Sequence, residues 1–252
     1  MQPSLGSHMT YFPRKEHSTG SRPHRKLVFI CMVGLLLFSL FPNEAAHADK
    51  EDFQIWTPVY LTVSHTPKIQ GWYEVQPRFG ENASEVNQLL LRLALGYKLD
   101  TRWSLWQGYA WTPAFVPEYT NENRIYQQLL YLRKWPTSEI LVSRSRLEWR
   151  WIENVPGTAV RFRTLLRGQY PFDEKKVWSL VAQDEIFVNF NSPPNGPAAG
   201  FDQNRLFFGL NRKVNDHLYF DGGYQWQSLN TKEPGFIDDN NHILLLQCFL
   251  IF

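Results

Sequence analysis

The segment RSRLEWRW, residues 144–151, places a charged residue at every second position. In a β-strand, successive side chains point to opposite faces of the sheet. One face of this strand would therefore carry three guanidinium groups and a carboxylate, and the other face would carry large apolar groups including Leu147, Trp149 and Trp151. The segment predicts a strand with one polar and one apolar face, and the rest of the sequence must decide which face meets water.

Runs of this kind recur along the chain after residue 48. Each is rich in aromatic residues and is followed by a break containing Gly, Pro, Asn or Asp, which are turn-forming residues. Pro58 interrupts the first run, so that this run could hold two short strands or lie outside the sheet. The count is then twelve or ten, and bacterial single-chain barrels normally have even numbers. The eleven runs are roughly 52–64, 68–79, 85–98, 102–111, 123–135, 139–152, 158–170, 177–190, 204–213, 217–229 and 242–252.

The breaks between the runs alternate in length. Short turns on one rim and long loops on the other are typical of outer-membrane barrels, whereas a soluble sandwich has no reason to sort its loops in this way. The segment 153–157 is an exception, because it is short where a long loop is expected. Short breaks are 99–101, 136–138, 171–176 and 214–216, and longer ones are 112–122, 191–203 and 230–241.

The types of side chain favour a membrane barrel over a soluble one. The polar faces are rich in Arg, Gln and Gly and contain little Lys, which suits a crowded polar interior more than a solvated exterior. Asp184 breaks the pattern, because it falls on an otherwise apolar face. Aromatic residues lie near the ends of the apolar faces, where an interfacial girdle belongs: Tyr97, Trp103, Trp111, Trp135, Trp151 and Tyr170.

We therefore expect an all-β fold, a transmembrane antiparallel up-and-down β-barrel of about ten to twelve strands. Its apolar face would contact lipid and its polar face would line the interior. With an even number of strands, both termini would face the periplasm. The alternative is a soluble periplasmic barrel whose apolar face points inward.

Both ends of the chain indicate export to a Gram-negative outer membrane. Basic residues precede the apolar run 27–41, and the small-x-small pattern at 46–48 follows it, as in a cleavable signal peptide. A membrane-spanning helix is the competing interpretation, but fifteen residues are short for a span. The final strand ends on Phe252, resembling the signal that the outer-membrane insertion machinery reads. The expected organisation is an extension with a signal peptide at 1–48 and one barrel domain at 49–252.

Charge and cysteine content exclude other classes. Removing residues 1–48 takes away five basic and two acidic residues, which leaves a net charge near −1 and no basic footprint for nucleic acid. Only Cys248 would remain, so no internal disulfide can form. Outer-membrane lipid and the insertion machinery are the expected partners.

Several thinly spread features of the chain after residue 48 resemble those of a known family: Glu74 and Arg78, Gly96-Tyr97, Gly108-Tyr109, the segment 144–151, Arg161-Phe162-Arg163, Glu185, Arg205 to Gly209, Gly223-Tyr224 and the final aromatic strand. In these features the sequence resembles the uncharacterised bacterial family named for domain of unknown function 2490. The resemblance covers nearly all of the chain after residue 48 and implies an outer-membrane barrel without an assigned catalytic residue.

The strongest candidate site is a belt of charged residues on the predicted inward face. The structural interpretation is a salt-bridged network that fills the barrel, because buried charges must be paired. The functional interpretation is an aqueous pore that favours anions, since nine arginines outnumber four acids. The belt consists of Glu74, Arg78, Arg92, Arg144, Arg146, Glu148, Arg150, Arg161, Arg163, Arg167, Glu185, Arg205 and Asp221.

Catalysis finds little support in the sequence. The three histidines of the expected mature chain, His65, His217 and His242, have no serine two positions away on the same strand face. There is no GxSxG, HExxH or phosphate-binding loop, and no Cys/His cluster suggests a metal. We therefore expect no enzyme, no cofactor and no metal site.

Overall fold

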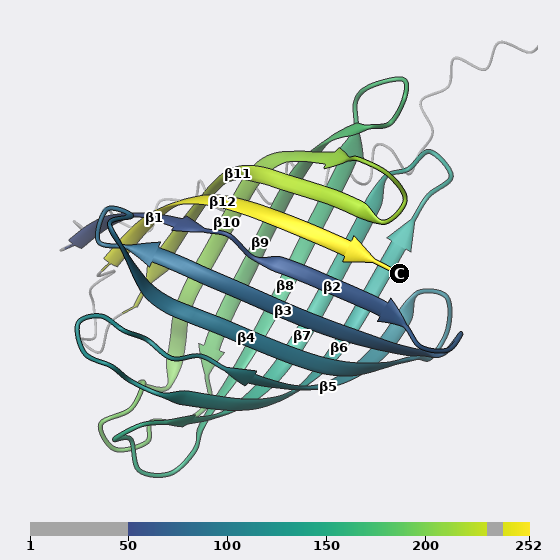
Figure 1. Ribbon diagram of the computed structural model, residues 1–252. Helices are drawn as coiled ribbons and strands as arrows, with labels where there is room; N and C mark the ends of the chain where they lie inside the picture. The colour runs from purple at the N-terminus through teal and green to yellow at the C-terminus, as the bar shows by residue number, and fades with distance from the viewer. Residues whose placement is uncertain (1–49, 231–238) are drawn as a thin grey trace, which may run out of the picture.

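The computed structural model describes residues 50–230 and 239–252, so the predicted signal peptide lies outside the described residues. No helix in these two ranges is long and apolar enough to cross a membrane. The described chain forms one sheet (Figure 1) of twelve strands: β1 (Lys50–Trp56), β2 (Val59–Ser64), β3 (Ile69–Gly80), β4 (Glu85–Lys98), β5 (Trp103–Trp111), β6 (Glu122–Lys134), β7 (Ile140–Ile152), β8 (Ala159–Pro171), β9 (Trp178–Asn189), β10 (Gly200–Lys213), β11 (Leu218–Leu229) and β12 (Asp239–Ile251).

The sheet closes into a barrel, which confirms the expected all-β, mainly antiparallel barrel fold. Strands β2 to β12 each pair antiparallel with the next strand along the chain. Strands β1 and β2 lie end to end beside β12, in the gap between β12 and β3, and both run parallel to β12 (Figure 1). Twelve strands therefore occupy eleven wall positions.

The interruption at Pro58 lies at the position where the barrel closes, and it divides the first predicted run into the two strands β1 and β2. Trp56 pairs with Leu245 and Val59 pairs with Cys248, so the ladder continues across the interruption at Pro58. Proline has no N–H to donate, but its carbonyl oxygen accepts a hydrogen bond from the N–H of Cys248 at 2.9 Å. The proline thus splits the strand without opening the wall.

An odd number of wall positions places the two ends of the barrel chain at opposite rims. β1 begins beside Asp239, whereas the N–H of Phe252 donates to the carbonyl oxygen of Thr62 at the end of β2. The expectation that both termini lie at one rim required an even number of strands around the wall, so it does not apply. The connections are still sorted by length between the two rims. The long loops 112–121 and 190–199 lie at one rim, and the short turns 65–68 and 99–102 lie at the other. The turn 81–84 is an exception, because it is short but lies at the long-loop rim.

Acidic and amide side chains organise the short turns. The N–H groups of Arg102 and Trp103 donate to Asp100 at 2.6 and 2.7 Å, and they hold the pKa of that carboxyl below its usual range. Asn215 accepts from the N–H of Leu218 in the same way, at 2.9 Å. These turns follow the preference of Asp and Asn for bonding the backbone a few residues ahead.

The faces of the wall are inverted relative to those of a soluble barrel. Most large apolar side chains point outward and are exposed, as with Leu105 on β5, Phe208 on β10 and Leu246 on β12. Most polar and charged side chains point inward and are buried or half-buried. The alternation that the sequence predicts is therefore largely kept, with the charged face inside.

Aromatic side chains gather near both rims on the outer face. Trp103 packs against Tyr131 near the short-turn rim, with ring centroids 4.8 Å apart. Near the long-loop rim, Trp111 Nε1 donates to Asn121 Oδ1 at 2.6 Å. Trp135 differs from the expected girdle residue, because it is buried against Ala182 on the outer wall.

Candidate functional site: the charged lumen

All thirteen residues of the predicted belt lie on inward-facing positions of the wall. Ten of them are buried, and the other three, Arg144, Arg150 and Arg167, are half-buried. The structure pairs most of them across strands that are neighbours in the barrel, in one larger network around Glu148 and in several separate pairs. The pairings follow from strand register, since Glu148 lies directly opposite Arg161 and Glu74 lies directly opposite Arg92.

Glu148 is the centre of the arrangement. Only 1% of its surface is exposed. Arg161 Nη2 donates to its Oε2 at 2.8 Å, and Arg163 Nη1 donates to its Oε1 at 3.3 Å. Arg146 Nη1 lies 3.5 Å from Oε1. One carboxylate therefore holds three guanidinium groups from β7 and β8.

Arg163 links Glu148 to a second carboxylate, Glu185 on β9. Its Nη2 lies 2.8 Å from Glu185 Oε1, which also accepts from Arg144 Nη2 at 2.7 Å. The remaining predicted pairs are separate. Arg92 Nη1 donates to Glu74 Oε1 at 2.6 Å, and Arg167 Nη1 lies 2.7 Å from Asp221 Oδ2.

Three charged residues of the lumen were missed from the sequence. Glu122 accepts from Arg124 at 2.7 and 2.6 Å and from Arg150 at 2.6 Å, and Asp202 accepts from Arg161 at 3.0 Å. The predicted strand began at residue 123, one position after Glu122, so Glu122 was not assigned to the inward face. Asp202 lies where the register shifts on β10, and alternation alone could not place it.

With these additions the lumen holds ten arginines and six carboxylates. Arg78 and Arg205 have no carboxylate within ion-pair distance in the described part of the chain. Arg78 Nη1 donates to Gln88 Oε1 at 2.8 Å, and Arg205 Nε donates to Gln203 Oε1 at 2.9 Å. Both guanidiniums also lie against the indole of Trp56, with Cζ 3.6 and 4.9 Å from its centroid.

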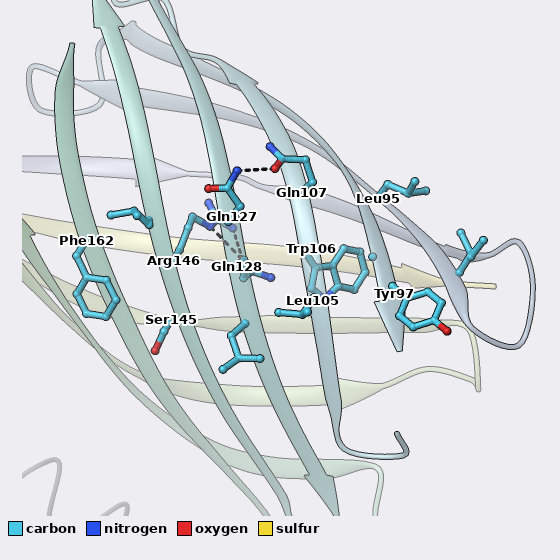
Figure 2. A pocket seen from close by; sticks show the side chains of 14 residues that line it. Leu95, Tyr97, Leu105, Trp106, Gln107, Gln127, Gln128, Ser145, Arg146 and Phe162 are labelled. Atoms are coloured by element: carbon cyan, nitrogen blue, oxygen red, sulfur yellow. Dashed lines mark hydrogen bonds between the residues drawn. The ribbon is translucent and has the colours of Figure 1, made fainter. Parts of the chain in front are cut away.

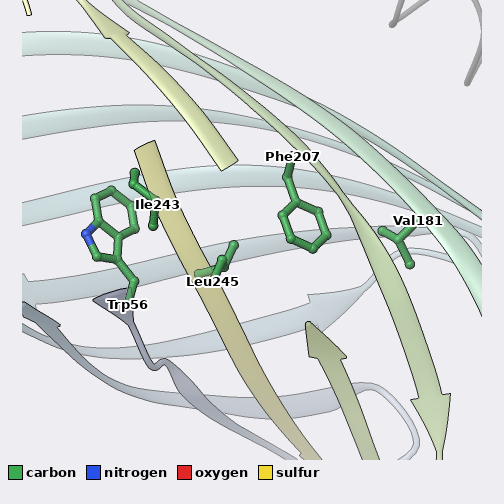
Figure 3. Packing of buried hydrophobic residues seen from close by; sticks show 5 residues of the cluster. All are labelled: Trp56, Val181, Phe207, Ile243 and Leu245. Carbon is green, nitrogen blue, oxygen red and sulfur yellow. The ribbon is translucent and has the colours of Figure 1, made fainter. Parts of the chain in front are cut away.

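The lumen also contains apolar side chains. Trp56 belongs to a cluster with Val181, Phe207, Ile243 and Leu245, which lie close together inside the wall (Figure 3). Phe187 contacts guanidinium groups as well, with Arg163 Cζ 4.5 Å from its ring centroid. Cation–π contacts of this kind let an arginine remain buried without a carboxylate. The alternation of side chains predicts a polar lining and does not reveal these apolar side chains in the lumen.

Inward glycines make room for large aromatic neighbours. Gly108 on β5 lies opposite Tyr126 on β6, and a Cβ at Gly108 would come within 2.1 Å of the phenol ring. Arg146 Cζ lies 4.0 Å from the centroid of the same ring. Tyr126 is therefore packed between the wall and the charged network.

Replacing Gly108 by Ala is expected to lower the free energy of unfolding by about 1–3 kcal/mol, because the added methyl group displaces Tyr126 in a filled interior. Thermal denaturation of the refolded protein measures the effect. Gly222→Ala is the matched control, since a Cβ there meets only Leu246 Cδ2, at 3.6 Å. Equal stability of the two variants would contradict the packing of Tyr126 on Gly108.

These observations define a class: a closed, mainly antiparallel β-barrel with an apolar exterior and a salt-bridged interior. The chain belongs to the family described as "Protein of unknown function (DUF2490)", whose model matches residues 53–238. It is also similar to an uncharacterized protein of Methylorubrum extorquens, at 32% identity over 209 residues, which cover 79% of this chain and 88% of that protein. The family resemblance in the sequence is thereby confirmed.

Proposed function

We propose that this protein is an integral β-barrel of the Gram-negative outer membrane, with a lumen closed by its own side chains. It would act as a structural or interaction protein and not as an enzyme. The observation that carries this proposal is the inverted wall, with exposed apolar residues outside and buried ion pairs inside. Exposed apolar surface of this extent suits lipid, because a water-soluble monomer rarely leaves large apolar patches uncovered.

The packing of the interior supports a closed lumen. In a water-filled channel the lining residues would remain accessible to solvent, as in wide porins. Here Glu148, Arg163 and Glu185 are each less than 5% exposed, and Tyr126 and Phe187 are no more than 1% exposed. Ion pairs and aromatic rings occupy the space through which a solute would pass.

Planar-bilayer recording of the refolded protein tests closure. We expect no conductance steps at moderate voltage, because the salt-bridged side chains leave no continuous water path. Heat-modifiable gel mobility of the same sample is the control for correct folding. Regular unitary steps from heat-modifiable protein would contradict the closed lumen.

The second candidate function is a weakly anion-favouring pore. The specific observation behind it is the excess of four arginines over carboxylates in the lumen. If conductance steps occur, the reversal potential in a salt gradient should show anion preference. Replacing Arg144, Arg146 and Arg161 by Gln should then reduce that preference, whereas a loss of stability alone would support the structural role.

The proposed partners follow from the same interpretation. The outer surface would be covered by membrane lipid, and the strand β12 with its final Phe252 would be read by the outer-membrane insertion machinery. Outer-membrane fractionation with detergent extraction tests the location. Recovery in the soluble periplasmic fraction would favour the alternative of a soluble barrel.

A further inference from the structure

Six of the outward-facing polar side chains lie near the middle of their strands. They form three hydrogen-bonded pairs on neighbouring strands. Gln127 Nε2 donates to Gln107 Oε1 at 2.6 Å, and Asn204 Nδ2 donates to Asp184 Oδ1 at 2.5 Å. Between these pairs, the hydroxyl groups of Ser145 and Thr164 lie 3.2 Å apart. We call Gln107, Gln127, Ser145, Thr164, Asp184 and Asn204 the polar belt.

The polar belt is confined to one side of the wall and to the middle of its strands. Gln107 is the central residue of β5, and Ser145 and Asp184 lie next to the centres of β7 and β9. The belt runs through β5 to β10, six of the eleven wall positions. On the other side, the corresponding mid-strand outward residues are apolar, for example Leu93 on β4 and Leu244 on β12.

Lipid is a poor partner for this surface. In the proposed orientation, the middle of each strand lies in the hydrocarbon core, where polar groups are costly and normally face protein or water. The hydrogen bonds within the three pairs use only some of the donors and acceptors of these side chains. A side-chain amide carries two donors and one acceptor, and a carboxylate accepts several bonds. The polar belt therefore points to a protein neighbour within the membrane.

The chemistry of the belt is complementary to itself. Its two ends differ, with amide donors at Gln107 and Gln127 and a carboxylate at Asp184. The amide end of one copy can donate to the carboxylate end of another copy. A contact between two Asp184 ends would place two carboxylates together, and a contact between two amide ends would leave both carboxylates without a neighbour. A hollow of about 580 Å³ adjoins the amide end, with Leu105 and Phe162 in its lining (Figure 2), and can receive apolar side chains of the neighbour.

We propose that this chain assembles in the membrane as a closed ring of copies, joined head to tail through the polar belt. Two convex barrels touch along a strip, which is narrower than the six wall positions that the belt occupies. A ring gives each copy two such strips, so that the amide end faces one neighbour and the Asp184 end faces the other. Head-to-tail contacts of this kind close into rings. The inference rests on the proposed membrane location.

Cysteine cross-linking in membranes tests the ring. In the full chain with Cys31→Ser and Cys248→Ser, the double variant Gln127→Cys with Asp184→Cys should give linked dimers and higher oligomers with a bifunctional methanethiosulfonate. Each single variant alone should give at most traces, because identical ends do not meet. Gln127→Cys with Leu244→Cys is the matched control and should remain monomeric, since β12 lies outside the belt.

The outcomes separate this inference from the proposed function. Protein that is absent from the membrane fraction would refute the location and, with it, the ring. Protein in the membrane without cross-links would refute the ring alone. Cross-links between identical residues would show a twofold contact, and a product of foreign mass would show another protein as the neighbour, and either would overturn the ring.

A second variant tests the role of the polar groups directly. The cross-linking pair is here Gln107→Cys with Thr164→Cys, in the same background without native cysteines. Adding Asp184→Leu and Asn204→Leu to this pair should lower the yield of linked oligomers by about tenfold. The membrane fraction and the heat-modifiable band should be unchanged, because leucine suits lipid. An unchanged yield of linked oligomers would contradict the assembly through hydrogen bonds.

Discussion

Replacing Glu148 by Gln is expected to lower the free energy of unfolding by about 3–5 kcal/mol, the largest loss from any single lumen substitution. The change keeps the shape of the side chain but removes its charge. Arg161, Arg163 and Arg146 then face one another without the carboxylate that they share, in an interior where Glu148 is 1% exposed. Urea unfolding of the refolded protein in phospholipid vesicles measures the loss.

The control for this prediction is an ion pair that water surrounds. Asp216 pairs with Lys213 in the turn after β10, and the Asp216 side chain is 85% exposed. Asp216→Asn should therefore leave the unfolding midpoint unchanged, because exposed ion pairs contribute little. If Glu148→Gln were as mild as Asp216→Asn, the lumen network would not hold the barrel together.

The second large effect concerns the outer wall. Leu93 near the middle of β4 and Leu99 in the following turn are equally exposed, at 54% and 53%. Leu93→Arg is expected to lower the free energy of unfolding in vesicles by about 2–4 kcal/mol, whereas Leu99→Arg near the interface costs about 0–1 kcal/mol. The difference arises from depth in the membrane, because accessibility to solvent is matched.

The same pair distinguishes the membrane barrel from a soluble one. In water, two leucines of equal exposure would tolerate arginine equally, since surface substitutions usually change stability little. Equal effects of Leu93→Arg and Leu99→Arg on unfolding would therefore contradict the lipid contact that we propose for the wall.

Alternation of side chains made much of this structure predictable. The segment 144–151 placed Arg146 and Glu148 on one face and Trp149 on the other, and the strand β7 has that arrangement. Because a strand repeats every two residues, each charged position could be assigned from its parity. The thirteen residues of the predicted charged belt consequently all lie in the lumen.

Features that depend on pairing between distant strands could not be predicted. The parity of one strand does not reveal that β1 and β2 close the wall parallel to β12, because closure depends on the number of positions around the barrel. The stacking of Arg78 and Arg205 on Trp56 joins residues from three strands. Similarly, Asp184 on the outer face accepts a hydrogen bond from Asn204 on the neighbouring strand, a pairing that the sequence of β9 alone does not reveal.

The odd number of wall positions has a consequence for the two ends of the barrel. The beginning of β1 lies at the long-loop rim and the end of β12 lies at the short-turn rim. In the proposed orientation, with short turns toward the periplasm, residue 50 would lie at the outer surface and Phe252 at the periplasmic surface. The insertion machinery would then meet β12 from the side at which it acts.

Spin-label accessibility at Leu93 tests the central claim, an apolar wall in lipid around a charged interior, most directly. Leu93→Cys and Leu99→Cys, each made with Cys31→Ser and Cys248→Ser, would carry a nitroxide in protein reconstituted into vesicles. We predict that the label at 93 is relaxed by oxygen and not by a water-soluble nickel chelate, with the opposite preference at 99. Equal access of the chelate to both labels would contradict the account.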